Sequence, residues 1–257
     1  MTRTSGNPRA DVSAWDADIL RLTAFCPPGT PINGEGWWAS VTGAEPDGVT
    51  EKPKAGERVE VGRHEGWPLA LQIQSREGRI DWVSGAFGES IENPETASLP
   101  QRVSSFVTLM KRWLREMSPP VSRLAFGAIL MLDVKGVQEG YKKLSDYLNF
   151  NLDAGASSDF HYQINRRRES KTLPPVPINR LMEWSVSSLH QKRLIVSAGA
   201  DYAAGDVTPP RFFLRAELDI NTATPEAGPP LPKDKLPDLL DELVGLAQEI
   251  VREGDIP

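Results

Sequence analysis

The chain has 257 residues, a formal net charge of −6, 39% apolar residues and 25% charged residues, which excludes a disordered chain and provides no global field for attracting nucleic acid or an anionic membrane. No stretch approaches the roughly 18 apolar residues of a membrane span, and the polar residues 1–10 lack the apolar core of a signal peptide. Cys26 is the only cysteine, which excludes an internal disulfide, a CxxC redox pair and a cysteine-rich zinc site, so we expect a cytoplasmic protein without cofactor or metal.

Short strands are predicted for much of the first half of the chain. The clearest spans 69–75, where Leu69, Leu71 and Ile73 alternate with more polar residues as in a half-buried strand. The Glu77–Gly78 pair that follows predicts a tight hairpin turn. The other predicted strands are 21–25, 37–42, 58–62 and 79–84, and residues 45–56 read as a polar loop.

An amphipathic helix is predicted for 101–117, because apolar residues recur there at steps of three and four. Residues 123–133 form a nearly continuous apolar run, typical of a strand buried on both faces. A second helix follows over 135–150, and a final one begins near Asp234 and ends at Gly254. Further strands are predicted at 159–167, 182–189, 193–200 and 211–220.

This order predicts an α+β fold of mostly antiparallel strands in one or two sheets, with the helices packed against one face. The chain divides into a flexible N-terminal arm (1–20), a first α+β half (21–120) and a second α+β half (121–257), which can also form one continuous domain.

Both halves end in a strand that contains an aspartate, a loop and an amphipathic helix. Asp81 lies in the RIDWV segment of the first half, and Asp219 lies in the ELDIN segment of the second. Internal duplication of one strand-loop-helix unit would explain this repetition. The alternative is that strand, loop and helix recur in this order by chance.

Carboxylates at strand ends offer one enzymatic hypothesis. Asp133 and Lys135 follow the buried strand, and with Asp81 and Asp219 they would form the centre of a divergent metal-dependent nuclease or phosphodiesterase. Structural roles explain the same residues: Asp133 can cap the next helix, and the other two aspartates can pair with nearby arginines. No nucleophile elbow, HExxH motif, Walker loop or dinucleotide fingerprint is present.

The most basic segment offers a nucleic-acid hypothesis. Arginines interleaved with aromatic residues can contact phosphates and stack on bases, so RNA or DNA binding is one alternative. A solvated sheet edge is the other. The basic residues are Arg166, Arg167, Arg168, Lys171 and Arg180.

Seven tryptophans are a high count, and several lie in the first half. Trp37, Trp38 and Trp67 are candidates for a partner-binding surface, since tryptophan is enriched at interface hot spots. The alternative role is packing in the core.

The segments RIDW, RLAFGAIL, INRLMEW, ELDINT and the closing REGD resemble, in this order, a family of uncharacterised prokaryotic proteins associated with mobile and defence-related genes. The resemblance covers the chain from about Arg58 and brings no catalytic residues. We therefore expect a non-enzymatic interaction or regulatory protein, a subunit of a larger prokaryotic assembly. Its partner would be another protein, different or a second copy, and not a membrane.

Overall fold

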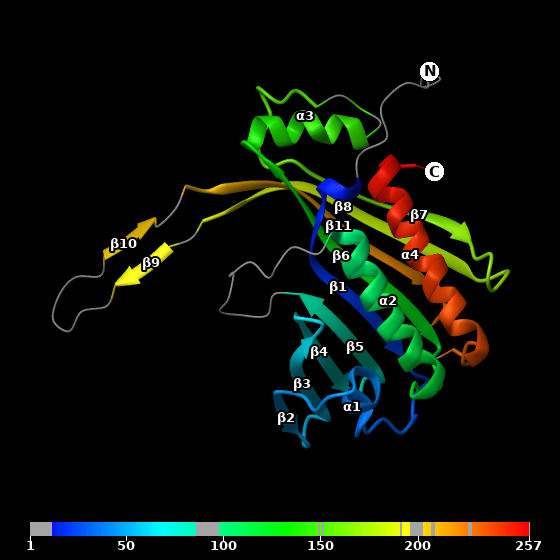
Figure 1. The fold of residues 1–257 in the computed structure, drawn as a ribbon. Coiled ribbons are helices and arrows are strands. Elements are labelled where there is room, and N and C mark those ends of the chain that lie inside the picture. Colours follow the sequence, from blue (N-terminus) through cyan, green and yellow to red (C-terminus); the bar gives the residue numbers. More distant parts are fainter. Residues whose placement is uncertain are drawn as a thin grey trace.

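A computed structural model describes residues 12–85, 98–148, 150, 152–190, 192–195, 203–206, 209–225 and 228–256. The described strands form a nine-stranded antiparallel sheet in the order β2-β3-β4-β5-β1-β6-β11-β8-β7, and β9 pairs with β10 in a separate ribbon (Figure 1). The strands are β1 (Asp16–Phe25), β2 (Gly48–Lys52), β3 (Glu57–His64), β4 (Trp67–Gln74), β5 (Arg79–Gly85), β6 (Arg123–Val134), β7 (His161–Glu169), β8 (Pro177–Leu189), β9 (Lys192–Ile195), β10 (Ala203–Asp206) and β11 (Arg211–Thr222).

The described helices are α1 (Trp37–Thr42), α2 (Leu99–Glu116), α3 (Val137–Tyr147) and α4 (Leu236–Glu253), with 3-10 turns at Val12–Ala14 and Lys233–Lys235. Helices α2 and α4 lie side by side across the centre of the sheet, where α2 contacts β1 and α4 contacts β6 and β11 (Figure 1). Helices and an antiparallel sheet together confirm the predicted α+β class. None of the described helices has the length and apolar character needed to cross a membrane.

Alternation along the strands separates a covered face from an open face of the sheet. Leu22 pairs with Trp82 and Phe126, and these side chains are buried on the covered face beneath the helices. On this face Trp38 of α1 stacks on Trp82 at 6.0 Å between ring centroids. Gly140 of α3 lies so close to Val186 of β8 that a Cβ at Gly140 would come within 2.7 Å of it.

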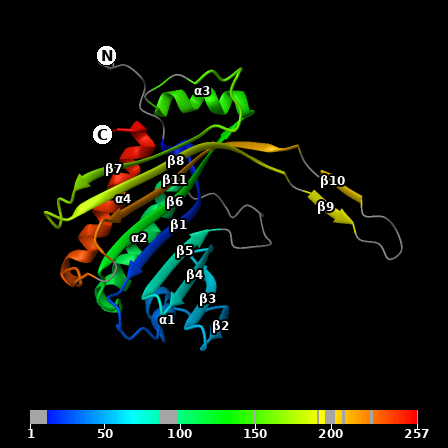
Figure 2. The same cartoon turned by 180° about the vertical axis from the view of Figure 1, so that it is seen from behind.

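The open face carries the side chains that alternate with the covered ones along each strand, such as Thr23, Asp81 and Ala125. It faces the viewer in Figure 2, which shows the molecule from behind. The helix contacts described above all fall on the covered face.

Several predicted elements are confirmed with small changes of boundary. Strands β3, β4 and β5, helix α2 and strand β6 form where the patterns place them. The β4–β5 hairpin turns at Gly78, which has a φ of +67° and whose absent Cβ would lie 2.8 Å from the Cys26 carbonyl oxygen. Gly254 ends α4 with a φ of +75°.

Other predictions are wrong. Residues 37–42 form helix α1 and not a strand, because Trp37, Trp38 and Val41 are all buried, which is one stripe of a helix but would occupy both faces of a strand. The predicted loop 45–56 contains the edge strand β2. Asp234 lies in a 3-10 turn and does not cap α4.

The boundary of the predicted N-terminal arm also shifts. Strand β1 begins at Asp16, so part of the segment predicted as an arm lies at the centre of the sheet. Residues 1–11 and, in the predicted strand 193–200, residues 196–200 are outside the described residues.

Apart from the edge strand β2 in the first half and the β9–β10 ribbon in the second, the two halves of the described chain have the same connectivity. Strands β1 and β6 lie side by side in the middle of the sheet. From β1 outward the first half continues with β5, β4 and β3, and from β6 outward the second half continues with β11, β8 and β7. A short helix follows each central strand, and a long helix, α2 or α4, ends each half.

Candidate functional site

The carboxylates of the nuclease hypothesis all lie on the open face, but they are not brought together. Strands β5 and β11, which carry Asp81 and Asp219, are separated by β1 and β6, a distance of about 14 Å at the usual strand spacing. Asp133 pairs with Arg211 at 3.0 Å, and the backbone N–H of Lys135 donates to Glu139. Within the described residues there is no group of three or more His, Cys, Asp or Glu side chains that could hold a metal.

Asp81 is satisfied by its own neighbours. Its side chain is buried, and its carboxylate accepts hydrogen bonds from Thr23 Oγ1 at 2.6 Å and from Arg79 Nε at 2.6 Å. This arrangement is a structural ion pair on the sheet.

The basic segment is divided between the two faces, because successive residues of a strand point in opposite directions. Arg166 and Arg168 of β7 lie on the covered face, where both bind α4 or the residues just after it. Arg166 forms two 2.9 Å hydrogen bonds with Asp255, and Arg168 forms two of 2.9 Å with Glu249. Only Arg167 projects from the open face.

The same contacts hold the C-terminal segment against the sheet. The hydrogen bonds from Arg166, with a further one from the Tyr162 hydroxyl, hold the pKa of Asp255 below its ordinary value. Burial, followed by the Asp255 carboxylate, raises the pKa of Tyr162 to about 12. Burial would raise the pKa of Glu242, but hydrogen bonds from Lys171, Ser170 and Thr172 lower it overall.

Arg180 belongs to this cluster and is fully buried on the covered face. Its Nη1 lies 3.4 Å from the Ile256 carbonyl oxygen, while its Nε and Nη2 have no partner among the described residues. Burial, and next the neighbouring Arg168, lowers the pKa of its guanidinium. The five basic residues thus form no continuous basic surface.

Two of the three candidate tryptophans are core residues. Trp37 packs edge-on against Trp113, and Trp38 stacks on Trp82, both inside the apolar core. Trp67 is half-buried at the start of β4, and the Arg102 guanidinium carbon lies 4.1 Å from the centroid of its ring. The two buried indoles therefore expose almost no surface to a partner.

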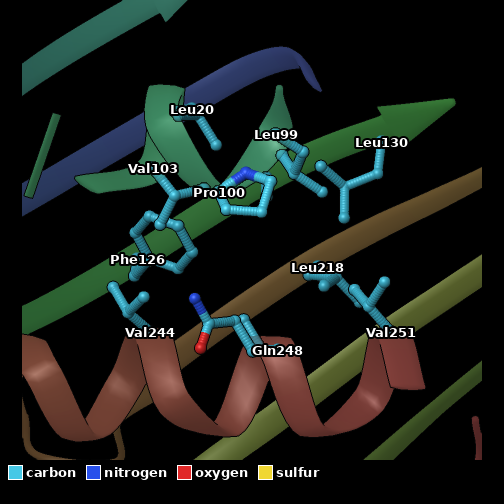
Figure 3. Close-up of a pocket in the computed structure, with 12 residues that line it drawn as sticks. Leu20, Leu99, Pro100, Val103, Phe126, Leu130, Leu218, Val244, Gln248 and Val251 are labelled. Carbon is cyan, nitrogen blue, oxygen red and sulfur yellow. The ribbon is translucent and has the colours of Figure 1, made fainter. Parts of the chain in front are cut away.

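An apolar pocket of about 40 Å³ lies between α2 and α4 (Figure 3). The residues that line the pocket include Leu99, Phe126, Leu218 and Val251, together with the side chain of Gln248. An apolar cavity of about 150 Å³ holds a ligand as small as benzene. This pocket is accordingly too small for a metabolite and represents loose packing between the two helices.

A second and smaller pocket, of about 10 Å³, lies beside Trp67 and Arg102. His64, Ser84 and Ser105 contribute polar atoms to its wall. Its volume is that of about one water molecule.

The most extensive polar arrangement among the described residues crosses the open face. We define the arginine–amide row as Arg79, Arg123, Arg167, Asn179 and Asn221. Arg123 Nη2 donates to Asn221 Oδ1 at 3.2 Å, and Asn179 Nδ2 donates to the same oxygen at 3.1 Å. Arg167 Nε donates to Asn179 Oδ1 at 2.9 Å, which extends the row to the edge strand β7.

Phe25 lies inside the row, at the end of β1. Its register partners are Arg79 on β5 and Arg123 on β6. The two guanidinium carbons lie 5.8 Å and 5.2 Å from the centroid of the Phe25 ring, within the range of cation–π attraction. The half-buried ring thus separates two positive groups on the open face.

The rest of the open face has a different character. There, Glu217 forms an ion pair with Arg215, and Glu183 lies 3.4 Å from the His161 ring. Half-buried apolar side chains lie beside these pairs on adjacent strands, among them Ile19 and Ile129, and Ile129 is the register partner of Glu217. The face therefore combines apolar, cationic and paired ionic surface.

Sequence reasoning missed the arginine–amide row. Its members come from strands far apart in the chain, so only the sheet register assembles them. A local signal exists in the alternation of Glu217, Asp219 and Asn221, which predicts one polar face for that strand.

Comparisons of the chain with family models, curated proteins and solved structures find no match. The evidence on function is therefore the geometry itself.

Proposed function

We propose that this protein is a non-enzymatic binding protein whose open sheet face docks another protein within a larger assembly. The observation that carries the proposal is the composition of that face, where half-buried apolar side chains lie among arginines and ion pairs such as Arg215 with Glu217. Antiparallel sheets commonly leave one face in water, but such faces are then mainly polar. A mixture of apolar centre, arginine and polar rim is typical of non-obligate protein interfaces.

The positions of the apolar residues support a contact surface that extends over several strands. Ile19 and Ile129 are register partners on β1 and β6, and Met131 follows on the same side of β6. Leu181 lies two strands away on β8, beside Asp219. All four side chains are half-buried, so they are available to a partner without unfolding the sheet.

The resemblance to uncharacterised prokaryotic proteins near mobile and defence-related genes gives this proposal its biological setting. Such an assembly would require a specific partner surface and no catalytic centre. In the described residues, the candidate catalytic carboxylates are engaged in hydrogen bonds or ion pairs within the sheet.

We also infer that the fold arose by duplication of one unit. The shared connectivity of the halves supports it, as do α2 and α4, which both have 18 residues, begin with Leu-Pro and end with Arg-Glu. Ser105 and Glu242 hold the same position within these two helices. Each forms a hydrogen bond between its helix and the turn of a hairpin. Ser105 donates to Glu65 in the β3–β4 turn, and Glu242 accepts from Ser170 in the β7–β8 turn.

A photo-crosslinking amino acid tests the proposed docking face in the source cells. Placed at Met131 or Gln163, on the open face, it should yield one discrete crosslinked protein. Thr108 and Gly245, exposed on α2 and α4, are the matched control positions and should yield none. Crosslinks confined to the helix positions would refute docking through the open face.

A further inference from the structure

The open face is electrically uneven. Four guanidinium groups, those of Arg21, Arg79, Arg123 and Arg167, lie on its part that contains the arginine–amide row. Three carboxylates accompany them: Asp81, which is buried beneath Arg79 and Thr23; Asp219, which accepts a 2.9 Å hydrogen bond from Asn221; and Glu169, which is exposed on the same side of β7 as Arg167. This part therefore carries an excess of positive charge on a chain whose net charge is −6.

Some of these guanidinium groups are exposed to solvent and are therefore accessible to a partner. Arg167 is exposed on the edge strand, and Arg79 has a third of its side chain exposed. Arg21 lies across Gly127, and a Cβ at that glycine would come within 3.2 Å of Arg21 Nη2. The glycine thus permits the guanidinium to lie flat on the sheet, where its Nε has no partner among the described residues.

The neighbouring amides carry no charge, and Asn221 is buried with its Nδ2 donating to Asp219. Asn179 and Asn221 join the cations in one hydrogen-bonded row, so their orientation is fixed before a partner arrives. Fixed guanidinium groups favour carboxylates, which they can bind through two parallel hydrogen bonds. Preorganisation reduces the entropy lost on binding.

We infer that the arginine–amide row binds an acidic segment of the partner protein. This inference rests on the proposed function and adds the chemistry of the partner. The segment would run across the strands from β5 to β7, with carboxylates near Arg79, Arg123 and Arg167 and an apolar side chain near Phe25. Guanidinium groups bind carboxylates and phosphates alike through two parallel hydrogen bonds, so the choice of an acidic peptide follows from the proposed protein partner, and the test below separates the two ligands.

A binding assay with defined probes tests this inference. Fluorescent oligoglutamate is titrated at low salt into the full chain and into the double variant Arg123→Gln/Arg167→Gln, which spares the Arg79–Asp81 pair. We expect the wild type to bind, the affinity to fall as salt is added, and the double variant to bind about fivefold or more weakly. The control variant Arg112→Gln/Arg115→Gln, on exposed positions of α2, should bind as the wild type does.

Three results would overturn the inference: no binding of oligoglutamate at low salt, equal binding by wild type and double variant, or tighter binding of oligouridylate that the double variant loses. The last would assign the row to nucleic acid. Circular dichroism verifies that each variant is folded. Crosslinking from the open face together with any of these results would leave the proposed function standing and remove only the acidic partner.

Discussion

Thr23 donates a 2.6 Å hydrogen bond to Asp81 across the β1–β5 pair, although both side chains are buried on the face of the sheet that the described helices do not cover. The carboxylate also accepts from Arg79, whose side chain is one-third exposed. This cluster joins the first strand of the sheet to the strand that precedes α2 in the chain.

We predict that Asp81→Ala destabilises the protein by about 2 kcal/mol, because it leaves a buried hydroxyl and a guanidinium without their acceptor. Asp133→Ala is the matched control, since Asp133 and its partner Arg211 are both mostly exposed, and it should change stability by about 0.5 kcal/mol or less. Urea unfolding measures both. Equal losses for the two variants would show that burial of Asp81 is unimportant.

Two glycines, one inside α4 and one directly after it, should respond in opposite directions to alanine. Gly254 has a φ of +75°, and a Cβ there would come within 2.0 Å of the Tyr147 carbonyl oxygen, so Gly254→Ala should destabilise by about 2 kcal/mol or more. Gly245 lies inside the helix with open space around its Cβ position, so Gly245→Ala should stabilise by about 0.5–1 kcal/mol. The difference in thermal midpoint between the variants tests this directly, and a stabilising Gly254→Ala would contradict the close approach to Tyr147.

Stability should fall in acid partly through Asp255. Arg166 holds the folded-state pKa of this carboxyl below its ordinary value of 3.8, so its contribution is present above that value and is lost as the pH falls through the folded-state pKa. Asp255→Asn should destabilise the protein near neutral pH and flatten the decline in acid. Urea unfolding from about pH 6 to about pH 2 measures how the free energy of unfolding changes with pH in the wild type and in the variant. Parallel curves for wild type and variant would show that Asp255 does not contribute.

The single thiol should be inert in the native state. Cys26 is buried, and burial raises its pKa to about 11, so little reactive thiolate exists near neutral pH. Labelling with a disulfide reagent should be slow in buffer and rapid in urea. Rapid, complete labelling of the folded protein would mean that the first turn after β1 opens readily.

Periodicity predicted most elements because burial on one side decides both the pattern and the structure. The alternation of β4 and the apolar stripe of α4 are examples, and both segments are confirmed. Short elements carry too little pattern, so α1 was predicted as a strand and β2 as a loop. Neither segment offers enough residues to separate a period of 2 from one of 3.6.

The candidate site could be predicted only in part. Arg166, Arg167 and Arg168 are adjacent in sequence and suggested one basic patch, but strand geometry turns two of them toward α4. Arg123, by contrast, meets Asn221 because β6 pairs with β11 in a particular register. Such a meeting depends on long-range pairing that no local pattern specifies.

The central position of β1 has a consequence during synthesis on the ribosome. This strand emerges before all other strands of the sheet, and its pairing with β5 can form once the first half has been made. The other edge of β1 pairs with β6, which is synthesised later. A nascent chain that ends before β6 therefore exposes the unpaired backbone N–H and C=O groups of this edge. Because the two halves have similar connectivity, such a truncated chain could pair with another copy of itself along this edge.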